Sequence, residues 1–142
     1  MQFSIKNDII LLMSTNNFPR VLLNKNEEKE IQQGYPWVFD NEISHIKYRK
    51  DEKSEWKTEP LKEALVEDGS AVEIYTKAGG FLGSGVLNRK SKIAIRLIGT
   101  EHADVIENDL YGFWEKRISK AYDIRKTYYS ETSNQLEKYS MY

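Results

Sequence analysis

Hydrophobic and polar positions alternate most regularly in the middle of the chain. Along residues 92–97, isoleucine or leucine occupies every second position, which predicts a strand with one apolar face. Residues 71–75 and 81–87 are two further apolar runs, and turn-forming residues at 77–80 and 88–91 separate the three segments. Consecutive strands joined by tight turns predict an antiparallel meander.

Glycines in this meander could suggest a phosphate-binding loop, but their context predicts otherwise. Gly79 and Gly80 lie in the predicted turn, whereas Gly83 and Gly85 fall on one face of the 81–87 strand. A phosphate loop needs a strand–loop–helix context, and no helix follows here. We therefore expect a hairpin whose second strand bends or allows close backbone contact at its glycines.

A short helix is predicted over residues 25–33, after a strand at 20–23. Asn24 and Glu27 have the spacing of a capping box, in which the two side chains satisfy free backbone N–H groups. Gly34 supplies the left-handed residue that ends the helix.

The segment that follows the helix changes from apolar to strongly charged. Residues 37–39 are an extended apolar run that Ile43 and Ile46 are expected to prolong, with Trp37 packed in the core. Residues 47–60 are dense in charges of both signs and show little periodicity. This composition predicts a surface loop or an insertion.

The periodicity becomes helical near Glu107 and remains so to about Lys126. Apolar residues at three- and four-residue steps share one helix face, namely Ile106, Leu110, Phe113, Trp114, Ile118, Ala121 and Tyr122. Strands come first and one long helix last, so a doubly wound nucleotide-binding fold is not expected in this chain.

The composition is that of a single domain with a polar surface, since 142 residues are 39% hydrophobic and 30% charged. With 21 basic and 22 acidic side chains the formal net charge is −1, so any nucleic-acid binding must come from a local basic patch. The absence of cysteine excludes disulfides, thiolate metal sites and thiol nucleophiles.

The N-terminal residues 1–18 show no clear period and are expected to form an extension, with Met13 as an alternative start of the protein. The apolar run at 9–13 is too short for a signal peptide, and no segment is long and apolar enough to span a bilayer. We therefore expect a cytoplasmic protein.

Groups with catalytic potential are sparse. His45 and His102 are far apart in the sequence and have no acidic or serine partner at a motif spacing, so both are expected at the surface. No nucleophile, metal-ligand set or paired carboxylates can be recognised. The residues therefore give no support to the hypothesis that the chain is an enzyme in its own right.

Basic residues gather around the 88–91 turn and the strand after it, and Tyr75 and Phe81 lie on the neighbouring strands. Basic side chains contact phosphates and aromatic rings stack on bases, which would suit RNA. The same residues are also what a solvated turn and strand face would contain. Both interpretations stay open at this point.

Several segments in a fixed order resemble one family. They are residues 20–23, Gly34-Tyr35-Pro36-Trp37-Val38-Phe39-Asp40-Asn41-Glu42-Ile43, residues 80–85 and residues 88–96. Together they resemble the N-terminal PUA-like domain of the class I SAM-dependent 23S rRNA (cytosine-C5) methyltransferases. The resemblance implies a mainly β PUA-like pseudo-barrel with flanking helices. The PUA-like domain would span residues 19–100, with a charged insertion at 47–62. A linker helix at 105–126 and a tail at 127–142 would follow it.

The resemblance also implies a function, which is to dock rRNA for a catalytic domain. The family's SAM-binding glycine loop and catalytic cysteine have no counterpart in this chain, so we expect no cofactor here and SAM only in the missing catalytic domain. An engineered domain, a truncated gene product and a stand-alone protein all remain open. The residues we expect to contact RNA are Lys25, Lys29, Tyr35, Arg89, Lys90, Lys92 and Arg96.

The helix at 107–126 suggests further partners. Its apolar face, with Trp114 and Phe113, is expected to pack against the missing methyltransferase domain or a second copy of the chain. The alternative function is therefore a structural or protein-interaction barrel, or a dimerisation domain, that does not bind RNA directly.

Overall fold

A computed structural model describes residues 17–130, and the chain divides into two compact units, Met1–Val105 and Ile106–Tyr142. The expected extension at 1–18, including the alternative start at Met13, lies almost entirely outside the described residues. The tail expected from residue 127 begins instead as helix up to Ser130, and its remainder is also outside the described residues.

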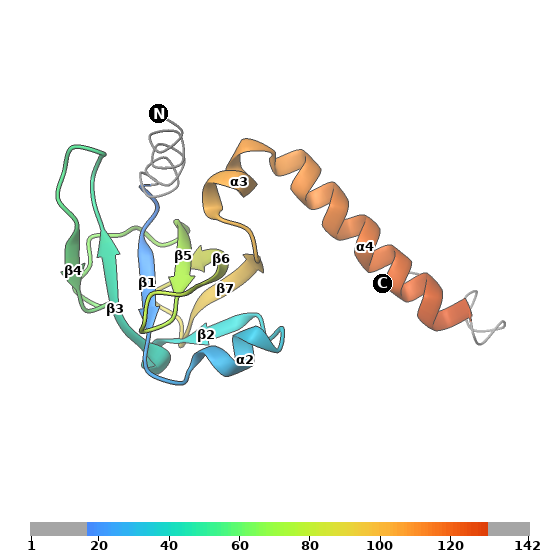
Figure 1. Ribbon diagram of the computed structural model, residues 1–142, viewed down its shortest axis with the longest axis horizontal. Coiled ribbons are helices and arrows are strands. Elements are labelled where there is room, and N and C mark those ends of the chain that lie inside the picture. The colour runs from blue at the N-terminus through green and yellow to red at the C-terminus, as the bar shows by residue number, and fades with distance from the viewer. Residues whose placement is uncertain (1–16, 131–142) are drawn as a thin grey trace, which may run out of the picture. The chain divides into compact units, whose positions relative to one another are not determined.

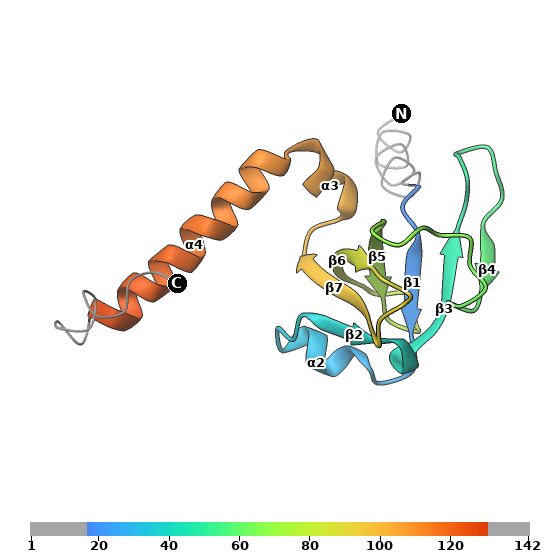
Figure 2. The ribbon, with the colours of Figure 1, turned by 180° about the vertical axis from the view of Figure 1, so that it is seen from behind.

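The first unit is built on one curled sheet, which confirms the mainly β prediction (Figures 1 and 2). Within the described residues its strand order is β2-β7-β6-β5-β1-β3-β4, with β1 and β5 parallel and all other neighbours antiparallel. The strands are β1 Arg20–Leu23, β2 Trp37–Phe39, β3 Ile43–Tyr48, β4 Lys57–Glu59, β5 Ala71–Tyr75, β6 Phe81–Leu87 and β7 Ile93–Gly99. The helical segments are α2 Glu28–Gln32, the 3₁₀ turn η1 Asp40–Glu42, α3 Ala103–Asn108 and α4 Leu110–Ser130.

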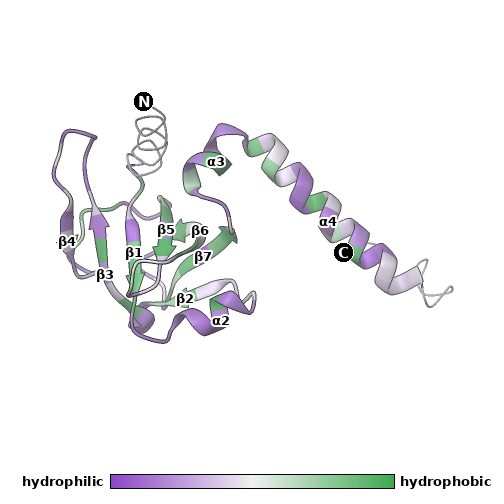
Figure 3. Ribbon diagram, in the orientation of Figure 1, coloured by the Kyte–Doolittle hydropathy of each residue, from purple (hydrophilic) through white to green (hydrophobic). Residues whose placement is uncertain are grey.

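The inside of the curled sheet holds the core of this unit. Hydrophobic residues dominate the central strands, whereas the edge strand β4 is hydrophilic (Figure 3). Val21, Ile46, Val72 and Ile74 are fully buried and belong to one apolar cluster. Their burial together with the rest of this cluster supplies the main apolar stabilisation of the fold.

The predicted meander of β5, β6 and β7 is confirmed, and the glycines of β6 explain how its strands approach. A Cβ atom on Gly85 would lie 2.5 Å from the carbonyl oxygen of Arg96, and one on Gly83 would lie 2.6 Å from that of Gly99. Only glycine permits this close backbone approach, as the spacing of the two residues predicted.

The helix before β2 begins differently from the prediction. The expected capping box is absent, because Glu27 is the N-cap and makes no side-chain cap hydrogen bond. The Asn24 side chain instead donates through Nδ2 to the carbonyl oxygen of Asn41, 3.0 Å away. Asn24 is therefore used to join two loops, and α2 is shorter than the predicted 25–33 helix.

The end of α2 agrees with the prediction. Gly34 has a positive φ of 96°, and its N–H donates to the carbonyl oxygen of Ile31. The next N–H, of Tyr35, donates to the carbonyl oxygen of Glu30. This pair of hydrogen bonds is a Schellman motif, which stops the helix and directs the chain into β2.

The expectation that Ile43 and Ile46 prolong the apolar strand at 37–39 is wrong. The η1 turn interrupts the chain, and its Glu42 carboxylate accepts a hydrogen bond of 3.3 Å from the N–H of Phe39. As a result β2 pairs with β7, whereas β3 pairs with β1 and β4. Hydrophobicity alone did not reveal a turn made of three polar residues.

The charged stretch at 47–60 is a β-hairpin rather than a loop throughout. β3 continues to Tyr48 and pairs with β4, and the Tyr48 hydroxyl donates to Glu59 over 2.6 Å, which raises the pKa of Tyr48. The guanidinium groups of Arg20 and Arg49 lie 4.5 and 4.7 Å from the ring centroid of Trp56. The contact with Arg20 joins the hairpin to β1.

The C-terminal helix is broken where the sequence predicted continuity. Asp109 separates α3 from α4, and its carboxylate accepts a 3.0 Å hydrogen bond from the N–H of Gly112. None of the residues of α4 is buried, and Leu110, Trp114 and Ile118 are exposed. Among the described residues, no helix has the length and apolarity needed to cross a membrane.

Candidate nucleic-acid interface

Two neighbouring rows of side chains cross β2, β7 and β6 and face opposite sides of the sheet. The inner row consists of Val38, Ile95 and Leu87, which lie directly opposite one another in the strand register. All three side chains are 0% exposed. Because successive residues of a strand point to opposite faces, the neighbouring row must face outward.

The outer row consists of Trp37, Arg96 and Val86, again in direct register. Trp37 is 39% exposed and Val86 38% exposed, and Arg96 is exposed as well. Tyr35, just before β2, is 41% exposed and meets the Trp37 ring edge-on, with centroids 5.7 Å apart and planes at 70°. An indole, a phenol and a guanidinium thus lie together on a solvent-facing sheet surface.

The prediction that Trp37 is packed in the core is wrong, and the strand geometry explains why. β2 has only three residues, and Val38 takes the inward position. Trp37 must therefore face outward, where its large apolar surface costs solvation free energy unless a ligand or partner covers it.

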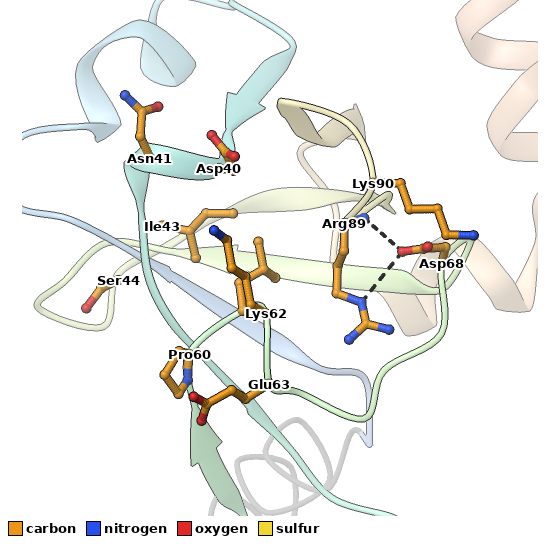
Figure 4. A pocket seen from close by; sticks show the side chains of 11 residues that line it. Asp40, Asn41, Ile43, Ser44, Pro60, Lys62, Glu63, Asp68, Arg89 and Lys90 are labelled. Atoms are coloured by element: carbon orange, nitrogen blue, oxygen red, sulfur yellow. Dashed lines mark hydrogen bonds and ion pairs between the residues drawn. The ribbon is translucent and has the colours of Figure 1, made fainter.

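The predicted RNA-contact residues near the β6–β7 turn separate into exposed and tethered ones. Lys90, Lys92 and Arg96 are exposed. Arg89 is tethered by Asp68, whose Oδ1 accepts a 2.8 Å hydrogen bond from the Arg89 N–H and lies 3.6 Å from Nε (Figure 4). The Arg89 guanidinium also donates to the carbonyl oxygen of Ala64. Arg89 therefore holds the loop between β4 and β5 to the β6–β7 turn.

A groove of about 700 Å³ opens beside Arg89 (Figure 4). Its charged lining residues are Asp40, Lys62, Glu63, Asp68, Arg89 and Lys90. Three cationic and three anionic groups nearly cancel, so this groove lacks the single sign of charge expected of a phosphate-binding site.

The remaining predicted contacts are exposed: Lys25 lies in the turn before α2 and Lys29 lies within the helix, and carboxylates surround both in the sequence. Burial raises the pKa of Glu42, and the negative charges of Glu27 and Glu30 raise it further. These three residues, which we call the acidic cluster, show that negative charge collects beside α2. The structure does not bring Lys25 or Lys29 together with the outer row.

Comparison with known proteins identifies the family. Residues 21–100 match the PUA-like domain family. The chain belongs to this family. Its relatives include the ribosomal RNA large subunit methyltransferase I of Alteromonas mediterranea, 25% identical over 107 residues, and that of Photobacterium profundum, 29% identical over 105 residues. These alignments cover 75% and 74% of this chain but only 22% of each relative, so the chain spans about a fifth of their length.

The PUA-like domain also contains a buried polar centre that was not predicted from the sequence. Glu73 faces outward from β5 yet is only 1% exposed. Its carboxylate accepts hydrogen bonds from the Tyr75 hydroxyl at 3.0 Å and the Ala103 N–H at 2.9 Å, and it lies 2.9 Å from His102 Nδ1. Burial, followed by the charge of Glu73, raises the pKa of Tyr75 well above its usual range.

The expectation that His102 is a plain surface residue is therefore wrong. Its ring stacks on Phe81 with centroids 3.7 Å apart, and Ser84 donates to the carbonyl oxygen of Glu101 over 2.7 Å. Residues 101–103 thus cover the outer face of the PUA-like domain at β5 and β6. Phe81 and Tyr75, which could have stacked on bases, are engaged in this centre instead.

Neither a metal site nor a SAM-binding loop can be recognised among the described residues of the PUA-like domain. In the part of the chain that the structure describes, no group of three or more His, Cys, Asp or Glu residues could hold a metal ion. Gly79, Gly80, Gly83 and Gly85 lie in and after the β5–β6 turn rather than before a helix. They do not form the glycine loop that would hold SAM, so these residues do not fit a SAM-binding site.

Proposed function

We propose that this PUA-like domain binds RNA through its outer row and docks ribosomal RNA for methylation by a SAM-dependent catalytic domain. The observation that carries the proposal is the exposed Trp37 directly opposite the exposed Arg96. Aromatic rings stack on bases, and guanidinium groups bind phosphates and stack on rings. RNA as the ligand agrees with the relatives of this chain, which are ribosomal RNA large subunit methyltransferases.

The charge of the protein restricts how it would bind. A net charge of −1 gives little general attraction to a polyanion, so affinity has to come from local contacts. The contacts we propose are four exposed residues of the predicted set. Tyr35 and Arg96 lie just before β2 and in β7, and Lys90 and Lys92 lie at the β6–β7 turn. Arg89 supports them by holding the turn in place.

A salt titration tests the proposal most simply. The full chain is titrated with a fluorescently labelled rRNA helix–loop fragment and, separately, with a DNA duplex of equal length. Preference for the RNA, with affinity falling as salt rises, is the expected result, and Arg96→Ala should lower the magnitude of the salt slope by about 0.7. Equal binding to both polymers, or an Arg96→Ala slope equal to that of the wild type, would contradict it.

The structure of α4 favours a second function beside the first. None of its 21 residues is buried, and Leu110, Trp114, Ile118 and Tyr122 recur along it at four-residue steps. Such an apolar stripe is typical of a helix that packs against another protein surface. We propose that α4 packs on a methyltransferase domain or on a second copy of the chain.

Light scattering after size exclusion distinguishes these partners. A dimer that Trp114→Glu converts to a monomer would show that a second copy covers the helix. A monomer at all concentrations would contradict the dimer and leave the methyltransferase domain as the proposed partner.

A further inference from the structure

We infer that the outer row takes an unpaired RNA nucleotide, whose base stacks on Trp37 while its phosphate is bound by Arg96. This inference rests on the proposed RNA binding and adds the class of RNA recognised. It also assigns a role to Trp37, which was not among the contacts predicted from the sequence.

The register of β2 and β7 puts the two groups at the right separation. Trp37 and Arg96 are direct partners in an antiparallel pair, so their Cβ atoms are roughly 4.5–5.5 Å apart. A side chain as long as arginine can reach beyond the edge of a base that lies on the indole. One nucleotide can therefore contact both residues, with its base on one and its phosphate on the other.

Tyr35 prepares the indole for stacking. Its ring meets Trp37 at 70° rather than face to face, so it restrains the indole without occupying a parallel stacking position. Trp37 still exposes 39% of its surface. On the other side of Arg96, Val86 extends the exposed apolar surface and can contact a ribose or a second base.

The acidic cluster determines which way the RNA backbone runs. A pocket lined by Glu30, Gln33, Gly34, Tyr35, Phe39 and Glu42 shares Tyr35 with the site but not Trp37 or Arg96. The negative charges of Glu30 and Glu42 at this pocket repel phosphates. The backbone is therefore expected to follow the β7 side, along Arg96, rather than α2 with Lys25 and Lys29.

The shape of the site favours an unpaired nucleotide over a duplex. Bases within a duplex are stacked on their neighbours and present only their edges, whereas bases in loops and bulges can be turned out. The outer row offers an indole side chain on a sheet surface, which can take the face of a turned-out base. It offers no helix or ribbon that could enter a groove.

The test compares three RNAs on the full chain: a hairpin with an unpaired loop, the same loop sequence paired into a duplex, and the hairpin with abasic loop positions. To isolate the signal of Trp37, the variant Trp56→Phe/Trp114→Phe leaves it as the sole tryptophan. We expect the loop RNA to quench Trp37 fluorescence and to bind more tightly than the other two RNAs.

Substitutions assign the effect to the residues. Trp37→Leu should bind the loop RNA about 5- to 150-fold more weakly, which corresponds to roughly 1–3 kcal/mol per stacked base. Trp37→Phe should recover part of the loss, and Glu30→Gln should tighten binding. Tyr111→Leu is the control, since Tyr111 is an aromatic residue that is 80% exposed on α4 and lies outside its apolar stripe, and it should bind like the wild type.

The possible failures are distinguishable. If duplex and loop RNAs bind equally and Trp37 is not quenched, the inference is overturned while RNA binding itself stands. If Trp37→Leu and Tyr111→Leu weaken binding equally, stacking on Trp37 is also overturned. If none of the three RNAs binds even at low salt, the proposed function fails and the inference fails with it.

Discussion

The inner and outer rows come from the same three strands, yet their side chains do different work. The inner row is fully buried, and its residues are all aliphatic. The outer row is exposed and combines an indole, a guanidinium and a valine. Strand alternation thus places the apolar packing on one face of the sheet and the proposed RNA contacts on the other, so we expect that stability and binding can each be changed with little effect on the other.

Removing an inner-row side chain should have the largest effect on stability. Ile95→Ala should lower the free energy of unfolding by about 2–5 kcal/mol, because it removes buried methyl groups and leaves a cavity. Val86→Ala in the outer row is the control and should change it by less than about 0.5 kcal/mol. Urea denaturation measures both, and equal losses would erase the distinction between the rows.

Adding a side chain to the inner face should have the next largest effect. Gly85→Ala places a Cβ 2.5 Å from the Arg96 carbonyl oxygen and 2.7 Å from Cγ2 of Ile95. The strands must shift, so we expect a loss of about 1–3 kcal/mol in the free energy of unfolding. Thermal denaturation is the measurement, and a variant as stable as the wild type would show that β6 and β7 approach less closely.

Two arginines sharpen the comparison, because both were predicted RNA contacts. Arg89→Ala should lower the free energy of unfolding by about 1 kcal/mol, since it breaks the hydrogen bond to Ala64 and the partly solvated contact with Asp68. Arg96→Ala should leave stability unchanged and weaken RNA binding. Urea denaturation and RNA titration of both variants give the answer, and the reverse assignment would contradict the account.

The smallest effect concerns His45 on the outer face of β3. Burial lowers the pKa of His45, and the charges of Lys47 and Lys77 lower it further. Lys77→Ala should therefore raise this pKa, which an NMR titration of the imidazole signals can follow. An unchanged or lower pKa would show that Lys77 does not act on His45.

The same shift has a consequence for stability. A folded-state pKa below the unfolded value of about 6.5 means that the folded protein binds fewer protons, so stability falls as the pH drops through that range. In Lys77→Ala this loss should be smaller.

The sequence predicted interactions between neighbouring residues better than those between distant ones. The alternation in β7 and the glycine spacing in β6 correctly predicted the meander, because both depend on neighbouring residues. Burial of Glu73 depends on Ala103, thirty positions away, and no local pattern signals it. In the sequence Arg89 is typical of a free cation, but in the fold it contacts Asp68, which is 21 positions away.

Trp37 shows a different limit of sequence reasoning. Its size and apolarity predict burial, but the direction of its side chain depends on which residue of a three-residue strand faces inward. That choice follows from the pairing of β2 with β7, which the expected continuous strand from 37 to 46 obscured. The exposed aromatic residue, the strongest sign of function, was thus the one that hydrophobicity misplaced.

The most direct test of the central claim is an NMR map of the full chain titrated with the loop RNA. We expect the largest chemical-shift changes at the indole N–H of Trp37 and around Arg96, and little change in the signals of the inner row. The largest changes in the groove between Lys62 and Lys90 or along α4, with the Trp37 indole unmoved, would contradict it.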